Sequence, residues 1–300
     1  ISVRKKFSYE IWYLIHLASY VAVLLAIPHQ FAFGTDFLAQ PWLATFYLGL
    51  YLFVFASVIW FKLVLPIVQS RGLRIQKIVP DLNNTTSVYI DGPGLKGIPY
   101  EAGQFFMLRV LTPKLWHQSH PFSVSSSPGE QSLRFTIGSR GDFTSVIPNL
   151  KPGTRVIVEG PYGIFSQKTR TKRKMLMIAA GIGVAPVRSL ARSVVSEPGD
   201  VTVLYRVNDK NDAALLEELR DICDQRQHNL VVLDGERFNQ SWLPGQSELP
   251  DHSRLLELAP HALESDIYVC GPAVWSKAVE QTLKKLNVNK NQIHLEEFAW

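Results

Sequence analysis

The sequence predicts three parts in series: a helical membrane segment, a small antiparallel β-barrel, and an α/β domain with a doubly wound parallel sheet. Two long spans near the N-terminus carry no Lys, Arg, Asp or Glu. The middle third alternates short strand-like runs with Gly, Pro and Asn turns, and the last third alternates apolar strands with helical spacing. We place the three parts at residues 1–70, 71–168 and 169–300.

Composition excludes several classes of protein. The net charge of +5 and the pI of about 9.1 are compatible with nucleic-acid binding, but the basic residues are not gathered on a recognition element, so we expect no nucleic-acid partner. The basic run at 170–174 is interpreted as a solvated linker. Cys223 and Cys270 lie far apart without metal-type spacing, which predicts neither a disulfide framework nor a zinc site.

The two charge-free spans cover residues 11–35 and 37–61. Each is long enough for a hydrocarbon core of ~30 Å, which needs about 20 apolar residues. Asp36, with Gly34 and Pro41 nearby, predicts a tight turn between them. A signal peptide or a buried soluble hairpin are the alternatives, but two consecutive spans of this length favour a transmembrane hairpin in contact with membrane lipid.

Basic residues give the expected orientation of this hairpin. They occur before the first span, at 4–6, and after the second, at 62–77, while the connecting loop has none. By the positive-inside rule both ends face the cytoplasm. We therefore expect a multi-pass protein of the cell membrane whose remaining domains are cytoplasmic.

The first span carries two histidines, His16 and His29. A histidine in lipid is costly unless it has a function, although a histidine that only packs between helices is the alternative. Their separation along a helix is ~20 Å, which suits two stacked haems better than one metal bound by both residues. Neither span has another histidine and position 1 is Ile, so we expect upstream transmembrane helices of the same protein to supply the partner ligands.

The middle part has strand-like runs at 88–90, 105–110, 133–137 and 155–158. No long helical period interrupts them, and a small antiparallel barrel is the architecture that this spacing predicts.

In the last part, the apolar run 175–178 precedes Ala-Ala-Gly-Ile-Gly-Val-Ala-Pro at 179–186. A strand, a glycine turn and a helix in this order aim free backbone N–H groups at a phosphate, although the same pattern also occurs as a plain turn. Gly181 and Gly183 would let the backbone approach a pyrophosphate, and Pro186 suits the first turn of a helix.

Further strands are expected at 201–205, 230–233 and 267–269, with helices at 212–223 and 273–286. Ligands of such sheets bind at the carboxyl ends of the strands. Arg206 follows one of these ends and can pair with the 2′-phosphate of NADPH, although a solvated arginine is the alternative. We therefore expect NADPH as the substrate, with some use of NADH.

The His-Pro-Phe-Ser sequence at 120–123 resembles the flavin motif of the ferredoxin-NADP reductase superfamily, and this variant is similar to the branch with NADPH oxidases and ferric reductases. The resemblance implies that FAD is bound by two stretches, in which Phe122 lies along the flavin, the Ser123 hydroxyl bonds the ring near N5, and His120 replaces an arginine of the wider superfamily. The second stretch, Arg-Gly-Asp-Phe-Thr at 140–144, would bind the diphosphate, with Thr144 capping a short helix. The residues assigned to FAD are His120, Pro121, Phe122, Ser123, Arg140, Gly141 and Thr144.

Two further stretches resemble the same family. Cys270, Gly271 and Pro272 match its Cys-Gly-Pro near the nicotinamide, and Trp300 stands where the superfamily has a terminal aromatic stacked on the flavin. The resemblance implies that Ser123, Cys270 and Trp300 form the catalytic set. A buried cysteine and an idle terminus are the alternatives.

The resemblance as a whole implies a two-domain reductase, an FAD barrel followed by an NADPH sheet, joined to a ferric-reductase-type haem segment. We expect a bacterial-type NADPH oxidase that moves electrons from cytoplasmic NADPH through FAD and two b-type haems to oxygen, producing superoxide. A ferric-chelate reductase with the same electron path is the first alternative. A haem-free membrane-anchored flavoprotein and a donor of electrons to another protein are the others, and a purely structural membrane protein would leave the nucleotide motifs unexplained.

Overall fold

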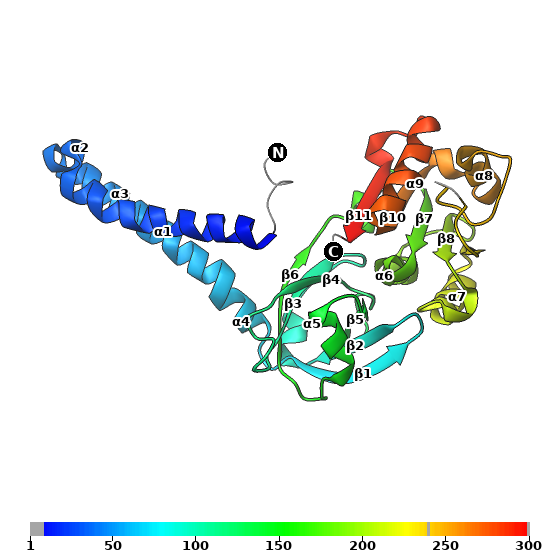
Figure 1. The fold of residues 1–300 in the computed structure, drawn as a ribbon, viewed down its shortest axis with the longest axis horizontal. Coiled ribbons are helices and arrows are strands. Elements are labelled where there is room, and N and C mark those ends of the chain that lie inside the picture. The colour runs from blue at the N-terminus through cyan, green and yellow to red at the C-terminus, as the bar shows by residue number, and fades with distance from the viewer. Residues whose placement is uncertain (1–8, 239–240, 299–300) are drawn as a thin grey trace. The chain divides into compact units, whose positions relative to one another are not determined.

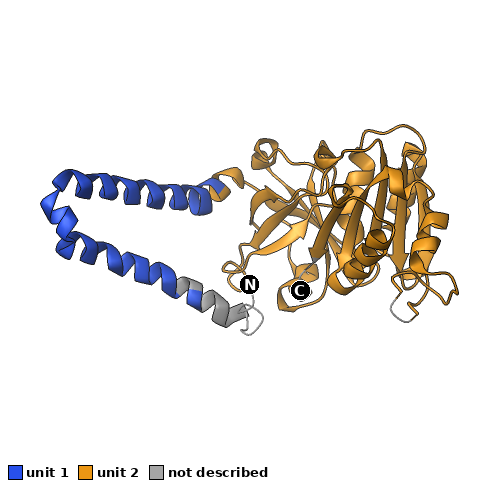
Figure 2. Cartoon of the chain, turned by 90° about the horizontal axis from the view of Figure 1, so that it is seen from above, with its two compact units in different colours: residues 1–65 blue, residues 66–300 orange. Residues whose placement is uncertain are grey.

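The computed structural model describes residues 9–238 and 241–298 (Figure 1). The chain divides into two compact units, residues 1–65 and residues 66–300, which are described separately (Figure 2).

Unit 1 is helical. Its elements are α1 (Tyr9–Phe33), α2 (Thr35–Ala39), α3 (Pro41–Ile59) and a π-helical turn (Trp60–Val64), after which α4 (Leu65–Gln69) continues into unit 2. The predicted tight turn is instead the short helix α2, in which the Gln40 N–H donates to the Asp36 carbonyl at 2.9 Å. Tyr51 of α3 donates to Gln30 of α1 at 2.8 Å, so the two long helices contact each other.

The two predicted membrane spans differ in the length of their apolar helices. Among the described residues, one helix, Pro41–Gln69, is long and apolar enough to cross a membrane, with a mean hydropathy of 2.2. The apolar part of the first helix that could be searched, Ala18–Phe33, is shorter. No residue of α3 is buried within the protein, so its large apolar side chains are exposed.

Unit 2 begins with the predicted antiparallel barrel. Two three-stranded sheets have the orders β1-β2-β5 and β4-β3-β6. Their strands are β1 (Arg74–Asp81), β2 (Thr85–Asp91), β3 (Phe105–Val110), β4 (His120–Ser123), β5 (Leu133–Gly138) and β6 (Val156–Tyr162). Single bridges between Arg74 and Arg155 and between Val124 and Phe135 join the sheets into a closed six-stranded barrel.

Alternation along the strands builds the barrel core. On β3, Phe106, Leu108 and Val110 are buried while the residues between them are partly exposed, as expected for a strand with one face inward. The short helix α5 (Asp142–Val146) adds Phe143 to this core.

The second half of unit 2 is a parallel sheet with the order β11-β10-β7-β8-β9. Its strands are β7 (Lys174–Ala180), β8 (Val201–Val207), β9 (Asn229–Asp234), β10 (Ser265–Pro272) and β11 (Ile293–Phe298), and its helices are α6 (Val184–Ser193), α7 (Leu216–Arg226), α8 (Asp251–Leu258) and α9 (Ala273–Lys285). Alternate residues of β7 pack against α6 and α7 on one face and against α8 and α9 on the other. The predicted doubly wound architecture is therefore confirmed.

Two elements differ from the sequence prediction. The helix expected from residue 212 begins at Leu216, because residues 210–212 form a 3₁₀ turn and Leu215 adopts a left-handed conformation with φ of 56°. The C-terminal residues form the edge strand β11, which pairs only with β10 in this sheet. Their short, polar sequence had been assigned no secondary structure.

A buried ion network joins the barrel to the parallel sheet. Nη1 of Arg134 on β5 donates to both carboxylate oxygens of Glu218 on α7 at 2.8 Å. Arg188 on α6 donates from Nε to the same carboxylate at 3.1 Å and from Nη1 to Glu130 of the barrel at 2.7 Å. Both arginine side chains are only 6% exposed. Removal of the Glu218 carboxylate would take away the partner of the buried Arg134 charge, while Arg188 would keep Glu130.

Replacing Glu218 with Gln tests this joint. Because hydrogen bonds to charged groups contribute ~1.5–3 kcal/mol, we expect the free energy of unfolding in urea to fall by about 2 kcal/mol. Glu217, one residue away, pairs only with exposed Arg220, so Glu217→Gln should change stability by less than about 0.5 kcal/mol. Equal effects of the two substitutions would contradict a joint held by Glu218.

Candidate functional site

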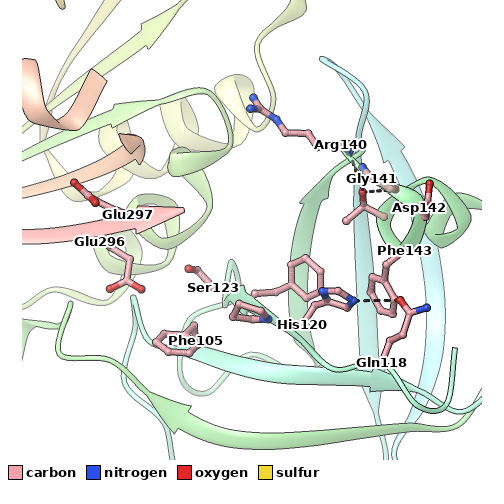
Figure 3. A pocket seen from close by; sticks show the side chains of 13 residues that line it. Phe105, Gln118, His120, Ser123, Arg140, Gly141, Asp142, Phe143, Glu296 and Glu297 are labelled. Atoms are coloured by element: carbon pink, nitrogen blue, oxygen red, sulfur yellow. Dashed lines mark hydrogen bonds between the residues drawn. The ribbon is translucent and has the colours of Figure 1, made fainter. Parts of the chain in front are cut away.

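A cavity of about 600 Å³ lies where β4, the start of α5 and the end of β11 meet (Figure 3). All seven residues assigned to FAD from the sequence line it, although they come from two stretches about twenty residues apart in the chain. The lining also includes Asp142 and Phe143, which belong to the predicted stretch 140–144 without having been assigned individually, and four residues that sequence analysis missed: Phe105, Gln118, Glu296 and Glu297.

One wall of the cavity is aromatic. The rings of Phe122 and Phe143 are stacked with centroids 6.1 Å apart, and the His120 ring lies 4.3 Å from that of Phe143. Burial lowers the pKa of His120, so its imidazole is neutral at pH 7. A neutral imidazole paired with Gln118 cannot supply the charge of the arginine it replaces in the flavin motif, and its contribution here is to the aromatic wall, where its ring is tilted 40° from that of Phe143.

Ser123 ends β4 and faces the cavity. Among the described residues its Oγ is fully buried and has no hydrogen-bond partner. Leaving a hydroxyl in this state costs ~1–3 kcal/mol, which a ligand with a polar edge would recover. The aromatic wall and this orphaned hydroxyl together fit a planar ring with polar atoms on its edge, such as a flavin.

The second predicted stretch enters the cavity at the start of α5. Thr144 is not the N-cap: that position is Gly141, and the Thr144 hydroxyl accepts from the amides of Arg140 and Gly141 at 2.8 and 2.9 Å. Thr144 therefore caps the helix from its third position, in a capping box with Gly141, and the amides of Arg140 and Gly141 are engaged by its hydroxyl. An added Cβ at Gly141 would meet no atom within 4 Å, so open space surrounds this turn.

Glu296 enters the cavity from the parallel sheet. It lies on β11 opposite Cys270 of β10, and desolvation raises the pKa of its carboxyl to about 7. Sequence analysis used this segment only for its terminal aromatic. Ile293 and Leu295 alternate with His294 and Glu296, which indicates a strand but would place the two apolar residues inward, so the sequence carries no signal for an inward Glu296.

The glycines of the 179–186 turn have separate functions. Gly181 has a positive φ of 53° with open space around it, so its conformation is what requires glycine. A Cβ on Gly183 would lie 2.1 Å from the Cys270 carbonyl oxygen, so this residue lets the turn pack on β10. Pro186 is buried in the first turn of α6, as predicted.

The nucleotide-side residues do not line the cavity described above. Arg206 is buried rather than solvated: Nη1 donates to Asn208 at 3.0 Å, and Nε and Nη2 have no partner among the described residues. Burial and nearby Arg237 lower the pKa of its guanidinium, which therefore favours an incoming anion.

The Cys-Gly-Pro segment ends β10. Cys270 is fully buried, and desolvation raises the pKa of its thiol, so it is a neutral thiol in the core. A Cβ on Gly271 would lie 2.7 Å from the Trp275 ring, so this position is packed against α9, which begins directly after Pro272.

Trp300 and the side chain of His16 lie outside the described residues. His29 is exposed on α1, with its ring 5.0 Å from that of Phe33. In the searched part of the chain no group of three or more His, Cys, Asp or Glu could hold a metal ion.

The fold and the cavity define a flavin- and nicotinamide-dependent oxidoreductase, and comparisons with known proteins agree. Residues 72–166 match the FAD-binding domain family and residues 177–281 match the oxidoreductase NAD-binding domain family. Together these two matches cover the FAD-binding and NAD-binding domains of a ferredoxin-NADP reductase-type module.

Individual relatives are distant. The ferredoxin reductase component of 3-ketosteroid-9-alpha-monooxygenase from Mycobacterium tuberculosis is 28% identical over 75% of this chain, and the chain covers only 64% of that protein. Respiratory burst oxidase homolog protein B from Arabidopsis thaliana is 26% identical over 62% of the chain and 24% of that protein. The FAD/NAD-binding domain of nitric oxide dioxygenase from Vibrio cholerae has the same fold, with a TM-score of 0.59, 21% identity and coverage of 76% of this chain and 98% of that domain.

The raised pKa of Glu296 predicts a pH dependence of stability. Between the ordinary value of 4.5 and about 7, the folded protein keeps a proton that the unfolded chain releases. Stability contributed by the neutral carboxyl is therefore lost as pH rises through this window. In Glu296→Gln, without added FAD, we expect the loss between about pH 5 and about pH 8 to be smaller than in the parent protein. Glu297→Gln is the control for the exposed neighbour, and an unchanged pH profile in Glu296→Gln would refute a buried titrating carboxyl.

Proposed function

We propose that this reductase module delivers electrons from NADPH to an acceptor at a membrane, as an NADPH oxidase that produces superoxide. The observation that carries the proposal is the direct connection of an exposed apolar helix, Pro41–Gln69, to the first strand of the FAD barrel, which begins at Arg74. A soluble reductase has no need of such a helix. The respiratory burst oxidase relative supports an oxidase over a reductase with a soluble partner.

Bound FAD would supply hydride acceptance from a nicotinamide and the release of single electrons. The aromatic wall of His120, Phe122 and Phe143 would hold its ring, and the Ser123 hydroxyl would bond the ring edge. Glu296 would close the cavity on the side of the parallel sheet and keep a proton near neutral pH.

The NADPH half of the site uses the carboxyl edge of the parallel sheet. The turn after β7, with Gly181, would receive the pyrophosphate, and the two orphaned nitrogens of Arg206 would receive the 2′-phosphate. Cys270 to Pro272 would flank the nicotinamide, and Trp300 would have to leave the flavin before hydride transfer.

The proposal includes two b-type haems, for which His16 and His29 would each supply one axial imidazole. Exposure of His29 on an apolar helix fits a ligand whose partner comes from another helix. Upstream transmembrane helices of the same protein would supply the remaining ligands. The module would then lie on the cytoplasmic side of the cell membrane, with oxygen reduced on the other side.

Other acceptors remain as alternatives. A ferric-chelate reductase would use the same residues. The Mycobacterium tuberculosis relative, a ferredoxin reductase component, favours a protein acceptor instead. A haem-free membrane-anchored flavoprotein would need neither His16 nor His29.

The deciding experiment uses the full-length protein in detergent with NADPH in air. We expect a Soret band and reduction of cytochrome c that superoxide dismutase suppresses, both diminished in His29→Leu. A parallel assay with chelated Fe(III) serves as the control for the acceptor. Fast Fe(III) reduction with negligible superoxide would identify a ferric reductase, and absence of a Soret band would identify a haem-free flavoprotein.

Coenzyme choice gives a second prediction. In Arg206→Gln, kcat/KM for NADPH should fall about tenfold to a hundredfold, because a charge-assisted contact to the 2′-phosphate is lost, while kcat/KM for NADH should change little. Steady-state reduction of a dye by each coenzyme measures this, with exposed Arg220→Gln as the control. Equal losses for both coenzymes would assign Arg206 a structural function.

A further inference from the structure

Three arginines from adjacent strands share one outer face of the barrel. Arg109 of β3 pairs in register with Ile157 of β6. Arg155 precedes Ile157 by two residues and so projects from the same side of the sheet. Its backbone forms an isolated antiparallel β-bridge with that of Arg74 on β1. Arg74 and Arg155 are exposed and Arg109 is partly exposed. We call these three residues the arginine face.

Trp116 lies beside the arginine face. Arg109 Nη1 donates to the Trp116 carbonyl at 3.2 Å. Leu115 is buried in the barrel core and holds the loop in place, while the Trp116 side chain is 59% exposed and Lys114 is also exposed. An exposed indole next to several cations is unusual on a soluble surface and has no part in the cavity.

The chain reaches this face directly from the apolar helix. Ser70, the residue after α4, donates from Oγ to the Val158 carbonyl at 3.2 Å and accepts from the Val158 amide at 2.9 Å. The Val156 amide then donates to the Leu73 carbonyl at 3.3 Å. The chain therefore runs antiparallel along β6 from Ser70 to Leu73, the residue before Arg74.

We propose that the arginine face and Trp116 dock on the anionic lipid surface of the membrane that helix Pro41–Gln69 crosses. The inference rests on the membrane placement in the proposed function. Guanidinium groups pair with phosphate, tryptophan is favoured at the headgroup level, and each added cation strengthens binding to an anionic surface roughly fivefold.

Acidic groups do not cancel this charge. Asp91 pairs in register with Arg74, and Glu159 lies farther along β6, where Oε1 accepts from the Tyr162 hydroxyl at 2.6 Å. Three arginines and Lys114 against Asp91 leave the end of the face at Arg74 and Arg155 positive, while Glu159 lies next to Val158, where the chain arrives from α4. An acidic protein surface would be attracted by the same charges, but the direct attachment to the apolar helix favours lipid.

The test uses the full-length protein in nanodiscs made with brominated lipids, which quench indole emission at the membrane. The emission of Trp116 is obtained as the difference between the parent protein and Trp116→Phe. We expect this difference to be quenched at least twofold in anionic nanodiscs and less in zwitterionic ones. The triple variant Arg74→Gln, Arg109→Gln, Arg155→Gln should remove the quenching. A control triple variant on exposed lysines of the parallel-sheet domain, Lys277→Gln, Lys285→Gln and Lys290→Gln, should not.

The emission of Trp42 and Trp60 on the apolar helix distinguishes a failure of lipid docking from a failure of the membrane placement. If their emission is quenched and that of Trp116 is not, the lipid-docking inference is overturned while the membrane placement stands. If none is quenched, the membrane placement fails as well. Quenching of Trp116 that the arginine substitutions do not change would overturn the electrostatic basis of the docking. Salt-sensitive binding of polyglutamate with unquenched Trp116 would assign the face to an acidic protein. Dye reduction by NADPH should be unaffected in every variant.

Discussion

The geometry of the cavity depends on the ion network between Arg134, Glu218 and Arg188. Its walls come from two domains: β4 and α5 belong to the barrel, and β11 belongs to the parallel sheet. The Arg134 side chain is itself fixed by a hydrogen bond, because its Nε donates to the Ser87 hydroxyl. The hydroxyls of Ser87 and Ser125 are in turn each hydrogen-bonded to the Thr136 hydroxyl at 2.9 Å. A charge pair backed by a chain of hydroxyl groups can fix one domain against the other more sharply than apolar packing alone. The position of Glu296 relative to Ser123 follows from this joint.

Local patterns allowed most of the fold to be predicted from the sequence. Alternation identified the barrel strands, and the glycine turn after an apolar run identified the start of the parallel sheet. The rest depends on contacts between distant residues. Phe143 and Glu296 reach the cavity only through tertiary packing, and β11 is recognisable as a strand chiefly because β10 pairs with it. Gly183 illustrates the same limit, since its neighbour in space is the Cys270 carbonyl and no local pattern contains that contact.

Among the described residues, Ser123 Oγ and two nitrogens of Arg206, Nε and Nη2, are buried without partners at places where a ligand is expected. Each is a source of instability in the free protein, because desolvated donors cost free energy until they are bonded. Other buried polar atoms of the described residues also lack a partner, namely Ser196 Oγ, Asp200 Oδ2 and His228 Nδ1, whereas some buried groups are fully bonded. Fully buried Asp266, for example, accepts from the Thr171 and Lys172 amides and contacts His294. What distinguishes Ser123 is its position, because it lines the cavity and its hydroxyl can therefore be bonded by a ligand.

The barrel is closed on one side by a single bridge between Val124 and Phe135. Val124 directly follows Ser123, and the next residue, Ser125, bonds the Arg134 carbonyl through its amide at 2.8 Å. We call this pairing of residues 124–125 with residues 134–135 the seam. It connects the floor of the cavity to Arg134, which holds the two domains together. Local opening in proteins begins where few backbone bonds must break. Amide hydrogen exchange at the seam would then report flavin occupancy and domain attachment together, because one local opening would weaken both the cavity floor and the contact between the domains.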